Sequence, residues 1–307
     1  GEVELTILDG EQPVLEARGE KLFELEIPGA KLWSPDTPHL YTARVRFGED
    51  LVEERFGIRT LSWTPEKGVA VNGERCVIRG ACIHHDNGLL GACTYPEAEE
   101  RRIRILKEAG YNAVRSAHNP CSKYLLEVCD KLGMLMMDEY VDCWYMHKTQ
   151  HDYASYVGEW WKQDMKDMVD KDYNHPSVIM YSTGNEVAES AQEKGIRLQQ
   201  EFTDYLHSLD DTRPVTCGIN IFFNFLSSAG FGVYSDENCS GGKRAKAQEK
   251  ARRLRVLQCP GGQDRLRLHE VRSLAASLRL EDPGRLCRHG YRGLQLRQLA
   301  LPQGREE

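Results

Sequence analysis

The sequence predicts an α/β fold in which a small antiparallel β-sandwich precedes an incomplete (β/α)8 barrel of about five strand-helix units. Three observations support this prediction. Residues 1–64 contain short apolar strands without a helical pattern, whereas residues 65–238 alternate strands with helices. Polar residues also follow directly on the ends of buried strands, where parallel barrels carry their active sites.

The N-terminal part, residues 1–64, reads as a series of strands separated by Gly, Pro and Asp turns. Alternating strands of this length indicate an antiparallel sandwich, and we predict no helix here. The expected strands are residues 3–8, 14–17, 22–27, 40–47 and 52–58.

The second part, residues 65–238, alternates short buried strands with longer amphipathic segments, which is typical of a parallel α/β sheet. Each expected strand is brief and apolar. The expected strands are residues 77–83, 113–116, 134–137, 178–181 and 215–218, and the expected helices are residues 95–109, 123–132, 157–173 and 195–209.

The composition excludes several classes of protein. A formal charge of -7 and a pI of about 5.9 argue against nucleic-acid binding and favour a neutral, hydroxyl-rich ligand. Ten cysteines make no Cys-x-x-Cys pair or zinc-finger spacing, so we expect reduced thiols in a cytoplasmic chain. No apolar run could span a membrane and no signal segment is present, but a chain that begins at Gly1 suggests a fragment.

The most informative stretch is residues 175–187. Its apolar run, residues 178–181, reads as a strand buried on both faces, and its polar groups, Asn185 and Glu186, come only at the end. At the carboxyl end of a barrel strand a carboxylate is placed for chemistry, so Glu186 is the candidate general acid/base. The alternative is that Glu186 is an acidic residue stabilised by the dipole of the following helix.

Other expected strand ends supply polar side chains to the same face. Arg79 and His84 belong to the first strand end, His118 and Asn119 to the second, and Asp138, Glu139, Asp142 and Trp144 to the third and its loop. Trp144 could stack on a sugar face, whereas the mid-helix Trp160 and Trp161 are expected in the core or at an interface. His84 and His85 near Asp86 could form a zinc site, but adjacent histidines rarely bind one metal, so we expect none.

Residues 174–180, Asn-His-Pro-Ser-Val-Ile-Met, together with the following Gly-Asn-Glu, resemble glycoside hydrolase family 2, which includes β-galactosidases and β-glucuronidases. Residues 32–41 and 56–59 look like the immunoglobulin-like domain that precedes the TIM barrel in that family. The resemblance covers about residues 25–238 and implies a partial immunoglobulin-like sandwich over residues 1–64.

The resemblance also implies roles for the candidate residues. Glu186 would be the acid/base, Asn185 would bind the sugar 2-hydroxyl, and His84 and His118 would line the sugar subsite. Glu139, with Asp138, would hold the substrate pocket. The nucleophile of the family is a second Glu at the end of the seventh strand, which we do not find in this chain.

The expected function is therefore that of a retaining β-glycosidase acting on oligosaccharides or β-glycosides. The run from His84 to Gly88 resembles the β-galactosidase branch, while a β-glucuronidase, a β-mannosidase, an inactive truncated fragment and a non-catalytic carbohydrate-binding relic stay open. The resemblance allows a Mg²⁺ or Na⁺ ion near the site and a homo-oligomeric full-length protein. We expect no nucleic-acid or membrane partner.

The last part, residues 239–307, departs from the barrel pattern: it has sixteen Lys or Arg, seven Asp or Glu and a single aromatic, Tyr291. Composition alone predicts a basic, disordered tail. However, residues 285–297 can be encoded so that the adjacent reading frame gives Ala-Tyr-Ala-Ala-Met-Asp-Ile-Ala-Gly-Tyr-Asn-Tyr-Gly, which resembles the sixth strand of a family 2 barrel. We therefore expect this tail to be out of frame.

Overall fold

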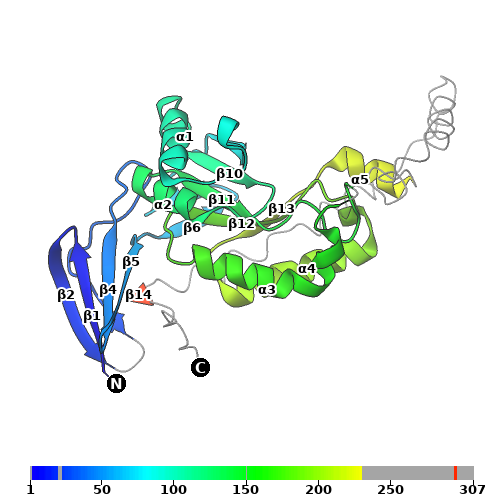
Figure 1. Ribbon diagram of the computed structural model, residues 1–307. Helices are drawn as coiled ribbons and strands as arrows, with labels where there is room; N and C mark the ends of the chain where they lie inside the picture. The colour runs from blue at the N-terminus through cyan, green and yellow to red at the C-terminus, as the bar shows by residue number, and fades with distance from the viewer. Residues whose placement is uncertain (1, 20–22, 150, 230–293, 296–307) are drawn as a thin grey trace.

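The computed structural model describes residues 2–19, 23–149, 151–229 and 294–295 (Figure 1). Within the predicted out-of-frame tail, only β14 (Leu294–Gln295) is described, and it pairs antiparallel with β3 (Glu24–Leu25). The rest of the prediction for residues 239–307, disorder included, lies outside the described residues.

The N-terminal sheet contains four antiparallel strands in the order β2-β1-β4-β5. Alternate side chains of a strand point to the same face, and here one face buries Leu5, Ile7 and Phe56. The predicted strands are confirmed, except that the expected strand 22–27 is shortened to β3. The four strands are β1 (Val3–Asp9), β2 (Gln12–Gly19), β4 (Tyr41–Phe47) and β5 (Asp50–Phe56).

A small antiparallel sheet that the sequence did not predict follows, in the order β6-β7-β8. It contains β6 (Leu61–Thr64), β7 (Gly68–Val71) and β8 (Glu74–Arg75), so the predicted domain boundary after residue 64 falls in the β6–β7 hairpin. The strand predicted at residues 77–83 is found further along the chain, as β9 (Gly80–His84).

The second part is a five-stranded parallel sheet in the order β13-β12-β11-β10-β9, flanked by helices as in a partial α/β barrel (Figure 1). The predicted alternation is thus confirmed, whereas the helix α5 was not foreseen. The strands are β9, β10 (Ala113–Ala117), β11 (Leu135–Glu139), β12 (Val178–Asn185) and β13 (Val215–Gly218); the helices are α1 (Pro96–Glu108), α2 (Lys123–Leu132), α3 (Ala154–Asp172), α4 (Glu193–Leu209) and α5 (Ile221–Ser228), with 3-10 turns η1 (Gly88–Leu90) and η2 (Ala188–Ala191).

The N-terminal sheet domain contacts the barrel part at the amino ends of the parallel strands. Trp33 is fully buried and donates from Nε1 to the Asp130 carbonyl at 2.9 Å. Arg59 donates to the carbonyls of Pro176 and Val178 at 2.6 and 2.7 Å, where β12 begins. This docking leaves the carboxyl ends of the strands, where the polar candidates lie, on the other edge of the sheet.

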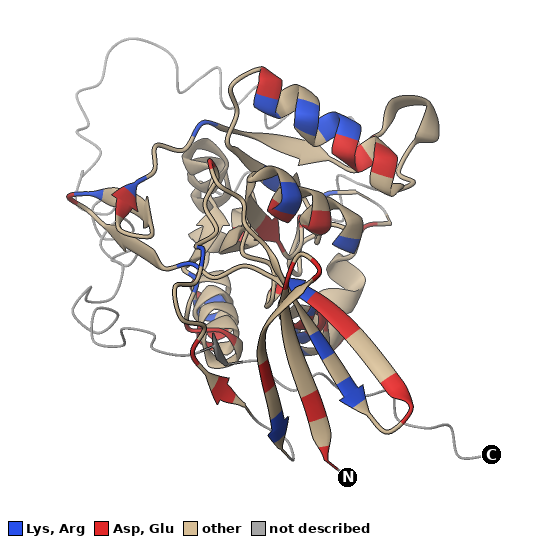
Figure 2. Ribbon diagram, turned by 90° about the vertical axis from the view of Figure 1, so that its left-hand side faces the viewer, with Lys and Arg blue, Asp and Glu red and all other residues tan. Residues whose placement is uncertain are grey.

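Charged residues of both signs are interspersed along the N-terminal strands and the helices (Figure 2). In the described ranges, no helix is both long and apolar enough to cross a membrane. The seven cysteines of these ranges are free thiols.

Candidate active site

Glu186 follows directly on β12 and has an unusual backbone conformation. Its φ of 48° lies in the left-handed region, which costs a non-glycine residue about 1–2 kcal/mol. Its backbone N–H donates to the Gly218 carbonyl at 2.6 Å, at the end of the neighbouring β13. Residues held in such conformations by their surroundings concentrate at functional sites.

The partly buried Glu186 side chain points to the loop after β13, where Asn220 Nδ2 donates to Oε1 at 2.9 Å. One carboxylate oxygen is therefore engaged by a neutral amide. The position of this carboxyl group beside a strand end is one at which a general acid/base can reach a bound ligand.

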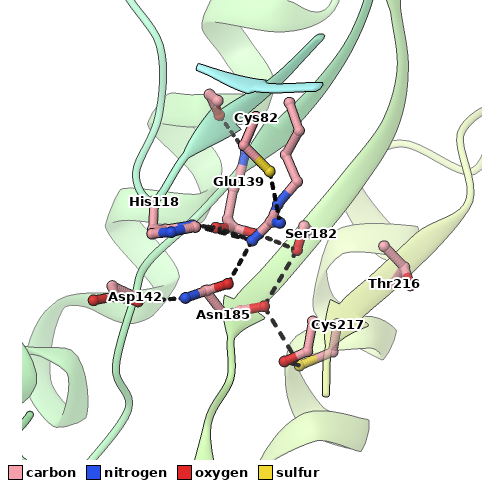
Figure 3. A network of polar contacts seen from close by, with 12 residues as sticks. Cys82, His118, Glu139, Asp142, Ser182, Asn185, Thr216 and Cys217 are labelled. Carbon is pink, nitrogen blue, oxygen red and sulfur yellow. Dashed lines mark hydrogen bonds and ion pairs between the residues drawn. The ribbon is translucent and has the colours of Figure 1, made fainter. Parts of the chain in front are cut away.

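Asn185 is fixed through both ends of its amide (Figure 3). Its Oδ1 accepts from Arg115 Nη2 at 2.7 Å, and its Nδ2 donates to Asp142 Oδ1 at 3.0 Å. Lys148 Nζ donates to the same Asp142 oxygen at 2.8 Å and to the Asn185 carbonyl at 2.5 Å. The amide has a second N–H on Nδ2, which is available to a ligand.

Glu139 lies at the centre of the network and is 0% exposed. Arg115 donates to both of its oxygens, from Nε to Oε2 at 2.9 Å and from Nη2 to Oε1 at 3.0 Å. His118 Nδ1 lies 2.8 Å from Oε1, and Ser182 Oγ donates to Oε2 at 2.6 Å. Both carboxylate oxygens are thus engaged by charged or polar neighbours, and the side chain has no exposed surface.

Arg115 remains a cation in this setting. Burial alone would lower the pKa of its guanidinium, but the hydrogen bonds and charge of Glu139 outweigh burial and raise that pKa. The pair joins β10 to β11, and through Asn185 it reaches β12.

Asp138, the residue before Glu139, has a supporting position and is also fully buried. It accepts from Ser116 Oγ at 2.7 Å, from Cys121 N at 2.9 Å and from Lys171 Nζ at 2.9 Å. Burial would raise the pKa of Asp138, but the Lys171 charge and these hydrogen bonds hold it below its ordinary value. Ser116 Oγ in turn accepts from the Glu139 N–H at 2.9 Å, so Asp138 acts on the site indirectly.

The histidines form an edge-on pair, with the His84 and His118 ring centroids 5.0 Å apart at 88°. His84 is exposed and His118 partly buried; Asn119, next along the chain, is exposed. The peptide bond between Ala117 and His118 is cis. The structure therefore brings His84 and His118 together beside Glu139, while their role toward a sugar stays a prediction.

Two candidates are not at the site. Arg79 does not follow the first strand, because β9 begins only at Gly80; its Nε donates to the Gly110 carbonyl at the opposite edge of the sheet. Trp144 is 0% exposed, so it cannot stack on a sugar face: its Nε1 donates to the Thr183 carbonyl at 2.9 Å and its ring packs against Phe202.

Four residues of this network were not predicted as site residues: Arg115, Lys148, Ser182 and Asn220. Arg115 could have been found, since a charge in the middle of an apolar strand requires a buried partner. For the other three, which lie in a loop, within a strand and before an unpredicted helix, the sequence offers no comparable signal.

The described residues contain no group of three or more His, Cys, Asp or Glu side chains that could hold a metal ion. The chemistry proposed below uses no Mg²⁺ or Na⁺ ion. A cavity of about 240 Å³ lies elsewhere, between the N-terminal sheet and α2, where Glu54, Lys123 and His175 contribute to its lining. We place the candidate site at the carboxyl ends of the strands, because the polar network converges there.

Two family profiles match the sequence. "Glycosyl hydrolases family 2" matches residues 3–59, and "Glycosyl hydrolases family 2, TIM barrel domain" matches residues 65–249, more than half of the chain.

Individual relatives agree with these profiles. A β-galactosidase from Bacteroides ovatus is 38% identical over 243 residues, which cover 67% of this chain and 29% of that protein. A β-glucuronidase from Chlorocebus aethiops is 29% identical, with 70% of this chain and 35% of that protein covered. The crystal structure of a glycosyl hydrolase family 2 member from Bacteroides cellulosilyticus matches with a TM-score of 0.65 and 39% identity, over 74% of this chain and 32% of that one. The chain thus spans only about a third of the length of these relatives.

Proposed function

Because this chain belongs to glycosyl hydrolase family 2, we propose that it carries the acid/base part of a retaining β-glycosidase, with Glu186 protonating the leaving oxygen. The main support is the position of Glu186 at the carboxyl end of β12. Its backbone is held by Gly218, its carboxylate is held by Asn220, and it adjoins the fixed amide of Asn185.

In this mechanism two carboxylates lie about 5 Å apart on either side of the glycosidic bond. Glu186 gives its proton to the leaving oxygen as the bond to the anomeric carbon breaks, while the second carboxylate attacks that carbon. Glu186, now ionised, then takes a proton from the water that releases the sugar. Asn185 contributes its remaining Nδ2 N–H to the 2-hydroxyl, a bond that strengthens in the transition state.

The second carboxylate is expected on the seventh barrel strand, as in the family the chain resembles. Glu139 is not a substitute, because Arg115, His118 and Ser182 occupy both of its oxygens. We therefore propose that hydrolysis needs a second carboxylate from the reading frame that continues through the seventh strand.

A β-galactoside is the substrate that we favour. A β-glucuronide carries a carboxylate that would need a cation, yet the two cations beside Asn185 are each paired: Arg115 with Glu139, and Lys148 with Asp142. A neutral sugar makes no such demand.

The test is Glu186→Gln in protein expressed from the restored frame. Acid assistance is worth about 10² to 10⁴ in rate, so the loss should fall in that range for lactose and be small for an aryl galactoside with a good leaving group. Added azide should partly restore release of the sugar from the aryl substrate. Equal losses on both substrates would show that Glu186 is not the acid.

A further inference from the structure

Asn220 is the N-cap of α5, and the cap fixes which way its amide faces. Its Oδ1 accepts from the backbone N–H groups of Phe222 and Phe223 at 3.1 and 3.2 Å. Turning the amide over would place its NH₂ group against these two donors, so the oxygen stays on the helix and Nδ2 faces away from it. Nδ2 is thereby directed to Glu186 Oε1, at 2.9 Å.

The helix that carries Asn220 is tied to the segment just after Glu186. Asn224 of α5 is buried, and its Oδ1 accepts from Ser190 Oγ of η2 at 3.1 Å. Two residues before Asn220, the Gly218 carbonyl accepts from the Glu186 N–H at 2.6 Å. The loop from β13 to α5 therefore holds Glu186 at both its backbone and its side chain.

We propose that Asn220 is the positioning residue for the acid/base of this site, a role that rests on the function proposed above. In the protonated form of Glu186, Oε1 accepts the Asn220 N–H and therefore directs a lone pair toward that donor. The acidic proton accordingly resides on the other oxygen, Oε2. Oε2 is then the oxygen that delivers the proton: its O–H bond breaks, the leaving oxygen gains the proton, and the electrons of the glycosidic bond pass to that oxygen.

The Asn220 side chain has two tasks that substitutions can separate. Asn220→Ser keeps an oxygen that can cap α5, because Ser and Asn are comparable N-caps, but it removes the N–H that reaches Glu186. Asn220→Asp likewise keeps the cap and replaces the donor with a second oxygen. Asn220→Ala loses both the cap and the donor.

The experiment uses the chain as it is, with N-bromoacetyl-β-D-galactosylamine as the probe. This reagent holds its bromoacetyl group where a leaving group would lie; a Glu186 oxygen attacks its CH₂ carbon, bromide leaves, and an ester forms. The rate of ester formation is followed by peptide mass spectrometry, with excess galactose as competitor and thermal unfolding of each variant measured in parallel.

We expect galactose-sensitive labelling of Glu186 in the parent chain and a rate at least about threefold lower in Asn220→Ser and Asn220→Asp. The reason is that a released carboxylate distributes over about three side-chain wells. Their unfolding midpoints should match that of the parent, while Asn220→Ala should unfold earlier. Parental labelling rates in both capped variants would overturn the positioning role alone. Absence of galactose-sensitive labelling in the parent would overturn the proposed function, and the positioning role with it.

Discussion

Replacing Arg115 with Met would remove two of the four hydrogen bonds that the Glu139 carboxylate accepts. Breaking a buried ion pair by removing one partner typically costs about 3–5 kcal/mol, because the remaining charge is buried without compensation. Here Glu139 is 0% exposed and the Arg115 side chain 24%, so solvent reaches one partner and the lower limit, about 3 kcal/mol, applies. For a chain of 307 residues, whose unfolding entropy is about 2.1 cal/mol/K per residue, the unfolding midpoint should fall by about 5 °C.

Thermal unfolding followed by circular dichroism measures this loss. The matched control is the double variant Arg115→Met with Glu139→Met, which removes both charges and should recover most of the stability, since apolar replacements of buried pairs are often neutral. A single variant that unfolds within about 2 °C of the parent would show that Glu139 is not desolvated. A double variant no more stable than the single one would show that the cost lies in packing.

Three further predictions concern backbone strain, pH and the gene. Because Glu186 has a φ of 48°, Glu186→Gly should be more stable than Glu186→Ala by about 1 kcal/mol in urea unfolding; equal stability would contradict the left-handed conformation. Burial raises the pKa of the Cys143 and Cys217 thiols to about 12, above the unfolded value of about 8.5. The stability that these two thiols contribute is therefore fully present below a pH of about 8.5, and it is lost as the pH rises toward 12. The unfolding free energy should therefore fall with a slope of up to about 1.4 kcal/mol per pH unit for each thiol, and Cys143→Ala should reduce the slope; an unchanged slope would refute its part. Sequencing around codons 236–246 should reveal one inserted or deleted base that restores a barrel frame, whereas a tail without family-like sequence in either other frame would refute the frameshift.

Local sequence signals were sufficient for several elements. The helix α2 (Lys123–Leu132) is found as predicted, because Ser122 caps its start by accepting from the Leu125 N–H and Gly133 ends it in the left-handed conformation. A Cβ atom at position 133 would also lie 2.3 Å from the Pro35 carbonyl oxygen. Both the left-handed backbone and the lack of space therefore require glycine at this position. The strand end at Asn185 and Glu186 was likewise readable from a change from apolar to polar residues.

The predictions for Arg79 and Trp144 were wrong because each depends on a contact between residues that are distant in the sequence. The first barrel strand starts at Gly80 because it pairs with Ala113 of β10, and this register removed Arg79 from the site. Trp144 is in the core because Phe202 of α4 packs against its ring, although its position in a loop after a strand suggested exposure.

By itself, the sequence determined the alternation of strands and helices, the bounds of α2 and the residues at the strand ends, because those depend on neighbours within a few positions. Only the tertiary structure decided the partners: Arg115 with Glu139, 24 positions apart, and Glu186 with Asn220, 34 positions apart. The parallel order of the strands brings these residues to one edge of the sheet. Buried charges and amides then take the partners that strand register and helix packing put within hydrogen-bonding distance, and no local pattern encodes that choice.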